Sequence, residues 1–211
     1  MGLPAAKLNL DQFIDWENEQ VERHEFYRGE IFAMVGVRRV HGTVTGNVFS
    51  ALRHHVKGTP CQAFSESLKV KVNENIFYPD VFVTCDKADL QTDMIFTAPT
   101  VIVEVLSKST QAFDRGLKFA AYRQITSLKE YLLVDPDIRV VELYRRGADE
   151  LFTLHDYTGQ PVCELTSIAC VLATSDIFEG LDLSDPTQPV DPAELAELAE
   201  LAELADSGKA S

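Results

Sequence analysis

Apolar residues recur along this 211-residue chain with two periods, one typical of helices and one typical of strands. From Val44 to Val56 a valine or leucine stands at every fourth position, which lays one apolar stripe along a helix. The period predicts this helix over 40–56 and another over 10–22. A third helix is expected over 113–125, started by Ser109 or Thr110 as its cap.

Strands are predicted where apolar and polar residues alternate or where Val, Ile and Phe form short runs. One hairpin turns at Arg28-Gly29, and a second turns within Asn73–Asn75. Further strands are expected at 81–83, 101–106, 130–136 and 138–146, the last two joined at a turn at Asp135-Pro136, and 150–157 and 162–167 are expected to extend the sheet. This order predicts an α/β fold with an α+β mixed sheet, in which the third helix crosses over between two strands.

The chain is expected to form one domain over 1–185 and an acidic low-complexity tail over 186–211. In the tail, leucines recur every three residues from Leu195 to Leu204, so they drift around a helix axis instead of forming one stripe. We therefore interpret the tail as a frayed, solvated helix. A tail that binds a partner is the alternative.

Charge and composition narrow the classes of partner. The formal net charge is −14, of which −5 lies between Asp191 and Ser211, so −9 is carried by the rest. An acidic body disfavours broad, nonspecific binding to nucleic acid but leaves room for a local basic groove. No stretch approaches the about 18 apolar residues that a membrane span requires, so we expect no membrane partner and a cytoplasmic location.

The four cysteines are scattered and form no C-x-x-C pair, which gives no support to a zinc ribbon or a thioredoxin-type motif. We interpret Cys61, Cys85, Cys163 and Cys170 as reduced residues of the core or the surface.

Two carboxylates interrupt apolar strands and are the first candidates for chemistry. Asp80 follows Pro79 at the start of one strand, and Glu104 lies inside another, on the same face as Ile102 and Leu106. If the two strands are neighbours, both carboxylates converge and require a proton, a lysine or a divalent cation between them. Hard oxygen ligands with room for water favour Mg²⁺ or Mn²⁺ over zinc.

A lysine can complete this group. Lys118 stands one helical turn after Asp114, on the helix that follows the Glu104 strand, whereas Lys69 and Lys71 on an earlier strand are rivals. Asp114 is expected to orient Lys118 or to cap the helix. His41, at the start of a helix, is a weaker candidate for a site role.

The chain resembles a known family, the bacterial Uma family, whose members look like PD-(D/E)XK restriction-endonuclease-like proteins. The resemblance runs from about Leu10 to Leu183 and rests on the order Glu25, His41, Pro79-Asp80, VIVEVLSKST, Asp114, Lys118, Tyr122 and EYLLVDP. It implies a restriction-endonuclease-like core with flanking helices, in which Asp80 and Glu104 bind the metal and Glu25 is a further acidic member. Leu106 stands where the superfamily motif has its lysine, and Lys118 matches the position from which this family supplies one.

These observations predict a Mg²⁺- or Mn²⁺-dependent endonuclease that hydrolyses nucleic acid, with DNA favoured over RNA, acting as a homo-oligomer, a dimer. Asp80 and Glu104 are expected to bind the metal, with Lys118 and Glu25 completing the catalytic group. Two alternatives stay open. One is a catalytically silent nuclease-like fold that binds nucleic acid or protein, and the other is a purely structural, oligomerising domain.

Overall fold

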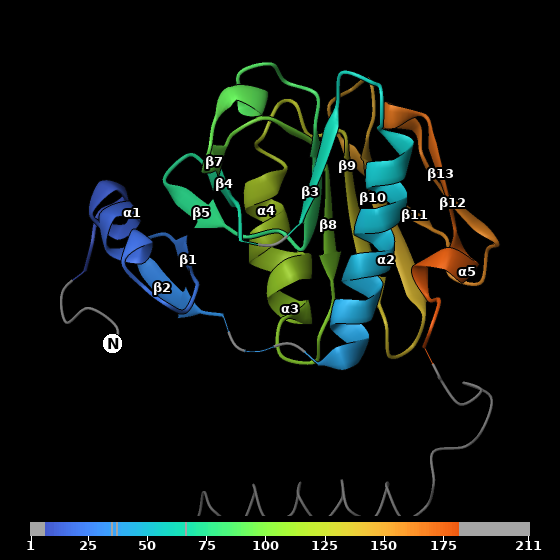
Figure 1. Cartoon of the computed structure of the whole chain (residues 1–211), viewed down its shortest axis with the longest axis horizontal. Helices are drawn as coiled ribbons and strands as arrows, with labels where there is room; N and C mark the ends of the chain where they lie inside the picture. The colour runs from blue at the N-terminus through green and yellow to red at the C-terminus, as the bar shows by residue number, and fades with distance from the viewer. Residues whose placement is uncertain (1–6, 35, 37, 66, 182–211) are drawn as a thin grey trace, which may run out of the picture. The chain divides into compact units, whose positions relative to one another are not determined.

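A computed structural model of the chain describes residues 7–34, 36, 38–65 and 67–181 (Figure 1). The acidic tail predicted over 186–211 lies outside these residues, and the domain boundary at 185 stays a prediction. None of the helices in the described part of the chain combines the length and the hydropathy that crossing a bilayer requires.

Two mixed layers of strands form the framework. The larger sheet has the strand order β11-β10-β9-β8-β6-β3, and the smaller has the order β2-β1-β5-β4-β7. The strands of the larger sheet are β3 (Gln62–Ser65), β6 (Val81–Thr84), β8 (Pro99–Val105), β9 (Glu130–Asp135), β10 (Val140–Arg146) and β11 (Phe152–Asp156). Those of the smaller sheet are β1 (His24–Tyr27), β2 (Glu30–Ala33), β4 (Lys69–Val72), β5 (Asn75–Phe77) and β7 (Ile95–Phe96).

Helices cover both faces of the larger sheet. Helix α2 (Arg39–His55) contacts β3, β6 and β8 on one face. The other face packs against a helix made of α3 (Gln111–Phe113), the π-helical segment η2 (Asp114–Lys118) and α4 (Phe119–Tyr122). Because both faces are buried, β8 reads as a nearly continuous apolar run, and its one acid, Glu104, stands out.

The composite helix lies between the two sheets (Figure 1). Its Ala121 and Tyr122 share one core with Phe77 of the smaller sheet and with Ile102 and Tyr131 of the larger one. Strands β8 and β9 are parallel, so this helix is the crossover that the sequence predicted. The mixed α/β fold is therefore confirmed.

The remaining elements are short. They are α1 (Leu10–Asn18), η1 (Asp89–Gln91), β12 (Val162–Leu165), η3 (Thr166–Ile168), β13 (Cys170–Ala173) and α5 (Thr174–Ile177). The first hairpin turns at Arg28 and Gly29, whose φ angles of 51° and 83° are both left-handed, as the turn between two twisted strands requires.

Three predictions about these elements were wrong. Helix α1 ends at Asn18, not at residue 22. The segment 162–167 does not extend the larger sheet, because β12 pairs with β13 in a two-stranded sheet of its own. The third helix ends at Tyr122, three residues early, and contains the π-helical segment.

The prediction of four reduced cysteines was also wrong, since Cys61 and Cys85 form a disulfide. Strands β3 and β6 are antiparallel neighbours, and the pairing of Gln62 with Thr84 brings the flanking cysteines face to face, with their Cα atoms 4.0 Å apart. The 24-residue separation hides this pairing in the sequence. Cys163 and Cys170 are free and buried, as expected.

Candidate active site

The predicted acids gather where the two sheets and the composite helix meet. Glu104 lies near the end of β8, and Glu25 lies on β1 of the other sheet. Both line a pocket of about 630 Å³ together with Asp80, Asp114 and Lys118. Residues from four separate parts of the chain thus share one cavity.

Lys118 is the centre of this group. Its Nζ lies 2.8 Å from Glu25 Oε1, 3.0 Å from Glu104 Oε1 and 3.6 Å from Asp114 Oδ1. All four side chains are buried, with at most 8% of any side chain exposed. The hydroxyl of Tyr122 also donates a hydrogen bond to Glu104 Oε1, at 3.1 Å.

The charges in this cluster do not balance, because one ammonium group faces three carboxylates. Burial raises the pKa of Glu104 well above its usual value of 4.5; Lys118 opposes the shift, and the neighbouring acids Asp114, Asp80 and Glu25 add to it. Burial likewise raises the pKa of Asp114. Burial alone would lower the pKa of Lys118, but attraction to Glu104, Glu25 and Asp114 outweighs it and raises this pKa well above 10.5. The lysine is therefore charged, and its single ammonium group is surrounded by three carboxyl groups.

Asp80 lies immediately before β6 and is more open to solvent, with 16% of its side chain exposed. Strand β6 pairs with β8, and Asp80 Oδ2 accepts a hydrogen bond from the backbone N–H of Val105, at 2.7 Å. His41 Nε2 lies 3.4 Å from the same oxygen. Asp80 thus has a backbone donor on one oxygen and lies beside the residue that follows Glu104.

This donor set fits a magnesium or manganese ion better than zinc. Among the described residues, no group of three or more His, Cys, Asp or Glu side chains is arranged to hold a metal. Mg²⁺ is commonly bound by one or two carboxylates, with water and substrate phosphates as the other ligands. Asp80 and Glu104 offer two such carboxylates in one pocket, where three carboxyl groups surround the single ammonium group of Lys118.

The rival lysines are not part of this cluster. Lys69 is buried on β4, where its Nζ donates a 3.0 Å hydrogen bond to Asn18 Oδ1 and lies 5.7 Å from the ring centre of Tyr78. Lys71 lies further along β4 and does not line the pocket. Of the three candidates, Lys118 is the one brought to the acids.

Behind the pocket lies a polar network that sequence reasoning missed. Glu17 is fully buried; its Oε1 accepts hydrogen bonds from the backbone N–H of His24 and the hydroxyl of Tyr78, and its Oε2 lies 3.0 Å from His24 Nδ1. The backbone N–H of Tyr78 in turn donates to Glu25 Oε1, at 3.1 Å. One signal was available, since Glu17 shares the apolar stripe of α1 with Leu10 and Phe13.

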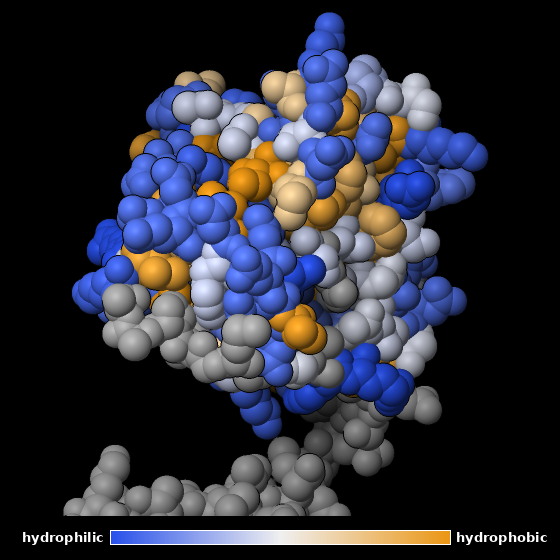
Figure 2. Space-filling view, turned by 60° about the vertical axis from the view of Figure 1, so that its left-hand side comes forward, coloured by the Kyte–Doolittle hydropathy of each residue, from blue (hydrophilic) through white to orange (hydrophobic). Residues whose placement is uncertain are grey.

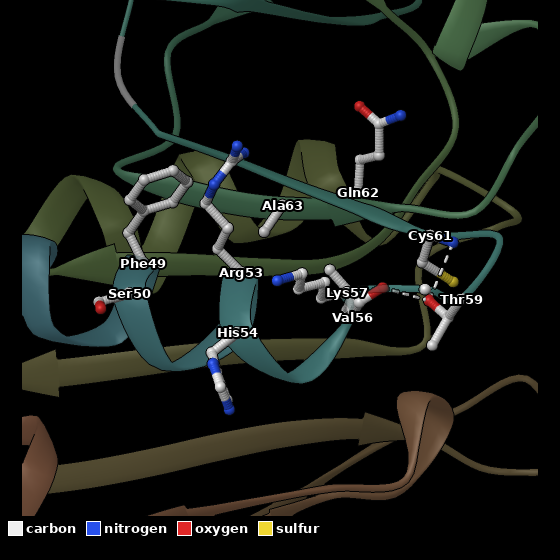
Figure 3. A pocket seen from close by; sticks show the side chains of 11 residues that line it. Phe49, Ser50, Arg53, His54, Val56, Lys57, Thr59, Cys61, Gln62 and Ala63 are labelled. Atoms are coloured by element: carbon white, nitrogen blue, oxygen red, sulfur yellow. Dashed lines mark hydrogen bonds between the residues drawn. The ribbon is translucent and has the colours of Figure 1, made fainter.

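A second pocket, of about 790 Å³, lies at the other end of α2 and is shown in Figure 3. Arg53 and Phe49 extend from the same side of the helix, with the guanidinium carbon 6.0 Å from the ring centre, and His54 extends from the opposite side. Its charged lining residues include Arg53 and Lys57 and no acid. It contains none of the predicted site residues.

The family model Uma2, described as "Putative restriction endonuclease", matches residues 10–172. Two proteins of Synechocystis sp., slr1290 and sll1609, both carrying the name "Uncharacterized protein", are similar to this chain. The first is 34% identical over 84% of this chain and 95% of its own length, and the second is 31% identical over 72% and 89%.

Among solved structures, the crystal structure of "a putative nuclease belonging to DUF820" from Anabaena variabilis is similar, with a TM-score of 0.69. It is 20% identical, and the match covers 81% of this chain and 97% of that one. At this identity the likeness shows that the two chains share a fold.

Proposed function

Because this chain belongs to the Uma2 family, we propose that it is a metal-dependent endonuclease that hydrolyses phosphodiester bonds of nucleic acid. The observation that carries the proposal is the cluster in which Lys118 contacts Glu25 and Glu104, beside Asp80, in an open pocket. Three carboxyl groups surround one ammonium group, so a bound cation would offset the repulsion between the acids that Lys118 leaves uncompensated.

In this proposal Asp80 and Glu104 hold Mg²⁺ or Mn²⁺, which when bound acidifies a water molecule and neutralises charge on the phosphate. Lys118 stabilises negative charge that develops on the phosphate oxygens, because it is a charged donor held in place before the substrate arrives. Glu25 fixes the position of Lys118 through the 2.8 Å ion pair. Asp114 and the hydroxyl of Tyr122 orient Lys118 and Glu104, respectively.

The proposed substrate is DNA in preference to RNA. A homodimer and a cytoplasmic location stay predictions. A second candidate function is a nucleic-acid-binding module without cleavage. It is favoured by Leu106, an apolar residue that is 1% exposed and stands where the nuclease motif has its lysine.

The test is purified protein with Mg²⁺ or Mn²⁺ against single- and double-stranded DNA and RNA. Asp80→Ala and Glu104→Ala are each expected to lower metal-dependent cleavage by more than about a hundredfold, as the loss of transition-state charge stabilisation does, with native far-ultraviolet circular dichroism. Glu164→Ala, which changes an exposed acid on β12, is the matched control and is expected to cleave as the wild type does. Equal cleavage by all of these proteins would contradict the proposal.

The lysines are tested in the same assay. Lys118→Met is expected to abolish turnover, whereas Lys69→Met, which changes a buried lysine outside the pocket, is expected to keep most of it. The reverse pattern would show that the wrong lysine has been assigned.

A further inference from the structure

A row of aromatic side chains leads from the core between the sheets to the rim of the candidate site. Phe77 packs on Phe113 with their ring centres 6.5 Å apart, and Phe113 packs on Phe32 at 5.4 Å. Phe77 is buried in the core, Phe113 is partly buried and packs against it, and Phe32 is 37% exposed. The row therefore ends in the ring of Phe32, which packs on Phe113 and is partly exposed to solvent.

Register places this ring beside the catalytic cluster. Phe32 of β2 is paired directly with Glu25 of β1, and directly paired residues of antiparallel strands project from the same face about 5 Å apart. Phe32 lines the same pocket as Asp80 and Glu104. Met34, two residues further along, also lines it and is 40% exposed.

The pocket joins this apolar wall to positive charge at its rim. Lys108 is exposed and lines the pocket, as does Arg38, whose guanidinium pairs with Asp137. Figure 2, which turns the left side of Figure 1 forward, shows apolar side chains reaching the surface in separate patches among hydrophilic residues. A ligand that suits this pocket has a flat apolar face and a phosphate group close enough to occupy the same pocket.

We propose that Phe32 is a stacking platform for a nucleobase next to the bond that is cut, with Met34 beside it and Lys108 contacting a neighbouring phosphate. This inference rests on the proposed function and names its substrate class: nucleic acid that is unpaired at the site. A base within a duplex has both faces stacked on its neighbours, so it cannot offer one to Phe32. A base in a single strand can, and aromatic side chains bind single strands in this way.

A second copy of the chain is the competing occupant, because β2 is an edge strand of its sheet. A partner strand added there would use the free backbone groups of the edge. The ring of Phe32 projects instead from the sheet face, the face that carries Glu25 and the pocket. This direction favours a ligand of the pocket.

The experiment measures binding separately from cleavage. Fluorescence anisotropy in chelator compares a labelled single strand of about 12 nucleotides, an abasic strand of the same length, and a duplex. The abasic strand keeps the phosphates and lacks the bases. The proteins are wild type, Phe32→Ala, Phe32→Tyr and Leu154→Ala, the last removing an apolar side chain that is 47% exposed on β11, the edge strand of the other sheet.

Wild type is expected to bind the normal strand more tightly than the abasic strand and the duplex. Phe32→Ala is expected to weaken binding of the normal strand by about five- to a hundredfold, the range found when a stacking aromatic is removed, and to leave binding of the abasic strand unchanged. Phe32→Tyr keeps a ring and is expected to bind as wild type does. Leu154→Ala is the neutral control.

Two outcomes would overturn the inference. One is an equal effect, or no effect, of Phe32→Ala on the normal and the abasic strand. The other is a change of molar mass on light scattering in Phe32→Ala with base-independent binding, which would assign the ring to an interface between two copies. Base-dependent binding through Phe32 without any cleavage would refute the proposed function alone, and cleavage with Phe32-independent binding would refute this inference alone.

Discussion

Replacing Lys118 with Met tests the charge balance of the site directly, because it removes the only ammonium group from the described part of the cluster. Three buried carboxylates remain, two of which lose ion pairs of 2.8 and 3.0 Å. At an effective dielectric near 20, each lost contact is worth about 6 kcal/mol of Coulomb attraction. The cost of burying the ammonium group offsets part of this.

The net loss expected for breaking a buried ion pair from one side is about 3–5 kcal/mol in the free energy of unfolding. For a chain of this size, about 2–4 °C of melting temperature corresponds to each kcal/mol, so we expect a fall of about 6–20 °C. Proton uptake by Glu104, whose pKa is already raised, keeps the loss from being larger.

The assay is urea and thermal unfolding of the metal-free protein at neutral pH. The double variant Lys118→Met/Glu104→Gln is the informative control, since it removes one of the stranded carboxylates and is expected to regain part of the stability. Lys69→Met tests whether any buried lysine would behave alike. It is expected to lose less, because Lys69 pairs with a neutral amide and not with three acids.

A stability of Lys118→Met within about 1 kcal/mol of the wild type, a typical effect of a surface pair, would refute this reasoning. So would a double variant that is as unstable as the sum of its single changes. Either result would mean that the three carboxylates are not ionised together around Lys118.

Three further predictions concern the pH, the metal and the disulfide. The raised pKa of Glu104 means that this carboxyl group binds a proton more tightly in the folded state than in the unfolded state. In chelator, the stability of wild type relative to Glu104→Gln should therefore increase as the pH falls from neutral toward 4.5 and decrease as the pH rises again. Melting curves of the two proteins over this pH range measure the difference. Asp80→Asn should be about as stable as wild type in chelator. At a hundred times Kd, Mn²⁺ should stabilise wild type by about 2.7 kcal/mol and the variant by much less, which melting curves with and without metal measure. A loss of stability that does not depend on metal would assign Asp80 a structural role. Replacing Cys61 and Cys85 together by Ser should lower the free energy of unfolding by about 3.5 kcal/mol, from the loop that they close, without changing the proposed nuclease activity; urea unfolding with and without reductant measures it.

Local rules were enough to predict some of the side chains that lie together in the pocket. The alternation of side chains along a strand singled out Glu104, and the spacing of one helical turn linked Lys118 to Asp114, a pair now found at 3.6 Å. Glu25 entered only through the resemblance to a family. Nothing in its own hairpin indicated that it would meet a lysine 93 positions later, because that contact depends on how the two sheets pack.

Long-range contacts account for most of what was missed. The hydroxyl of Tyr78 reaches Glu17 across 61 positions, and the disulfide joins cysteines whose strands had no predictable pairing. The separate β12–β13 sheet was missed for a similar reason, since its alternating pattern does not specify a partner strand. The roles of the individual site residues, unlike their positions, stay predictions.

Tyr78 connects the pocket with the polar network around Glu17, because its backbone and its side chain each hold one acid. Its backbone N–H holds Glu25, and its hydroxyl holds Glu17 on α1. A random-mutagenesis screen for lost activity should therefore return two groups of hits, one lining the pocket and one around Glu17 and His24 that touches no substrate. Folded variants of the second group would bind nucleic acid as tightly as the wild type and yet turn it over slowly.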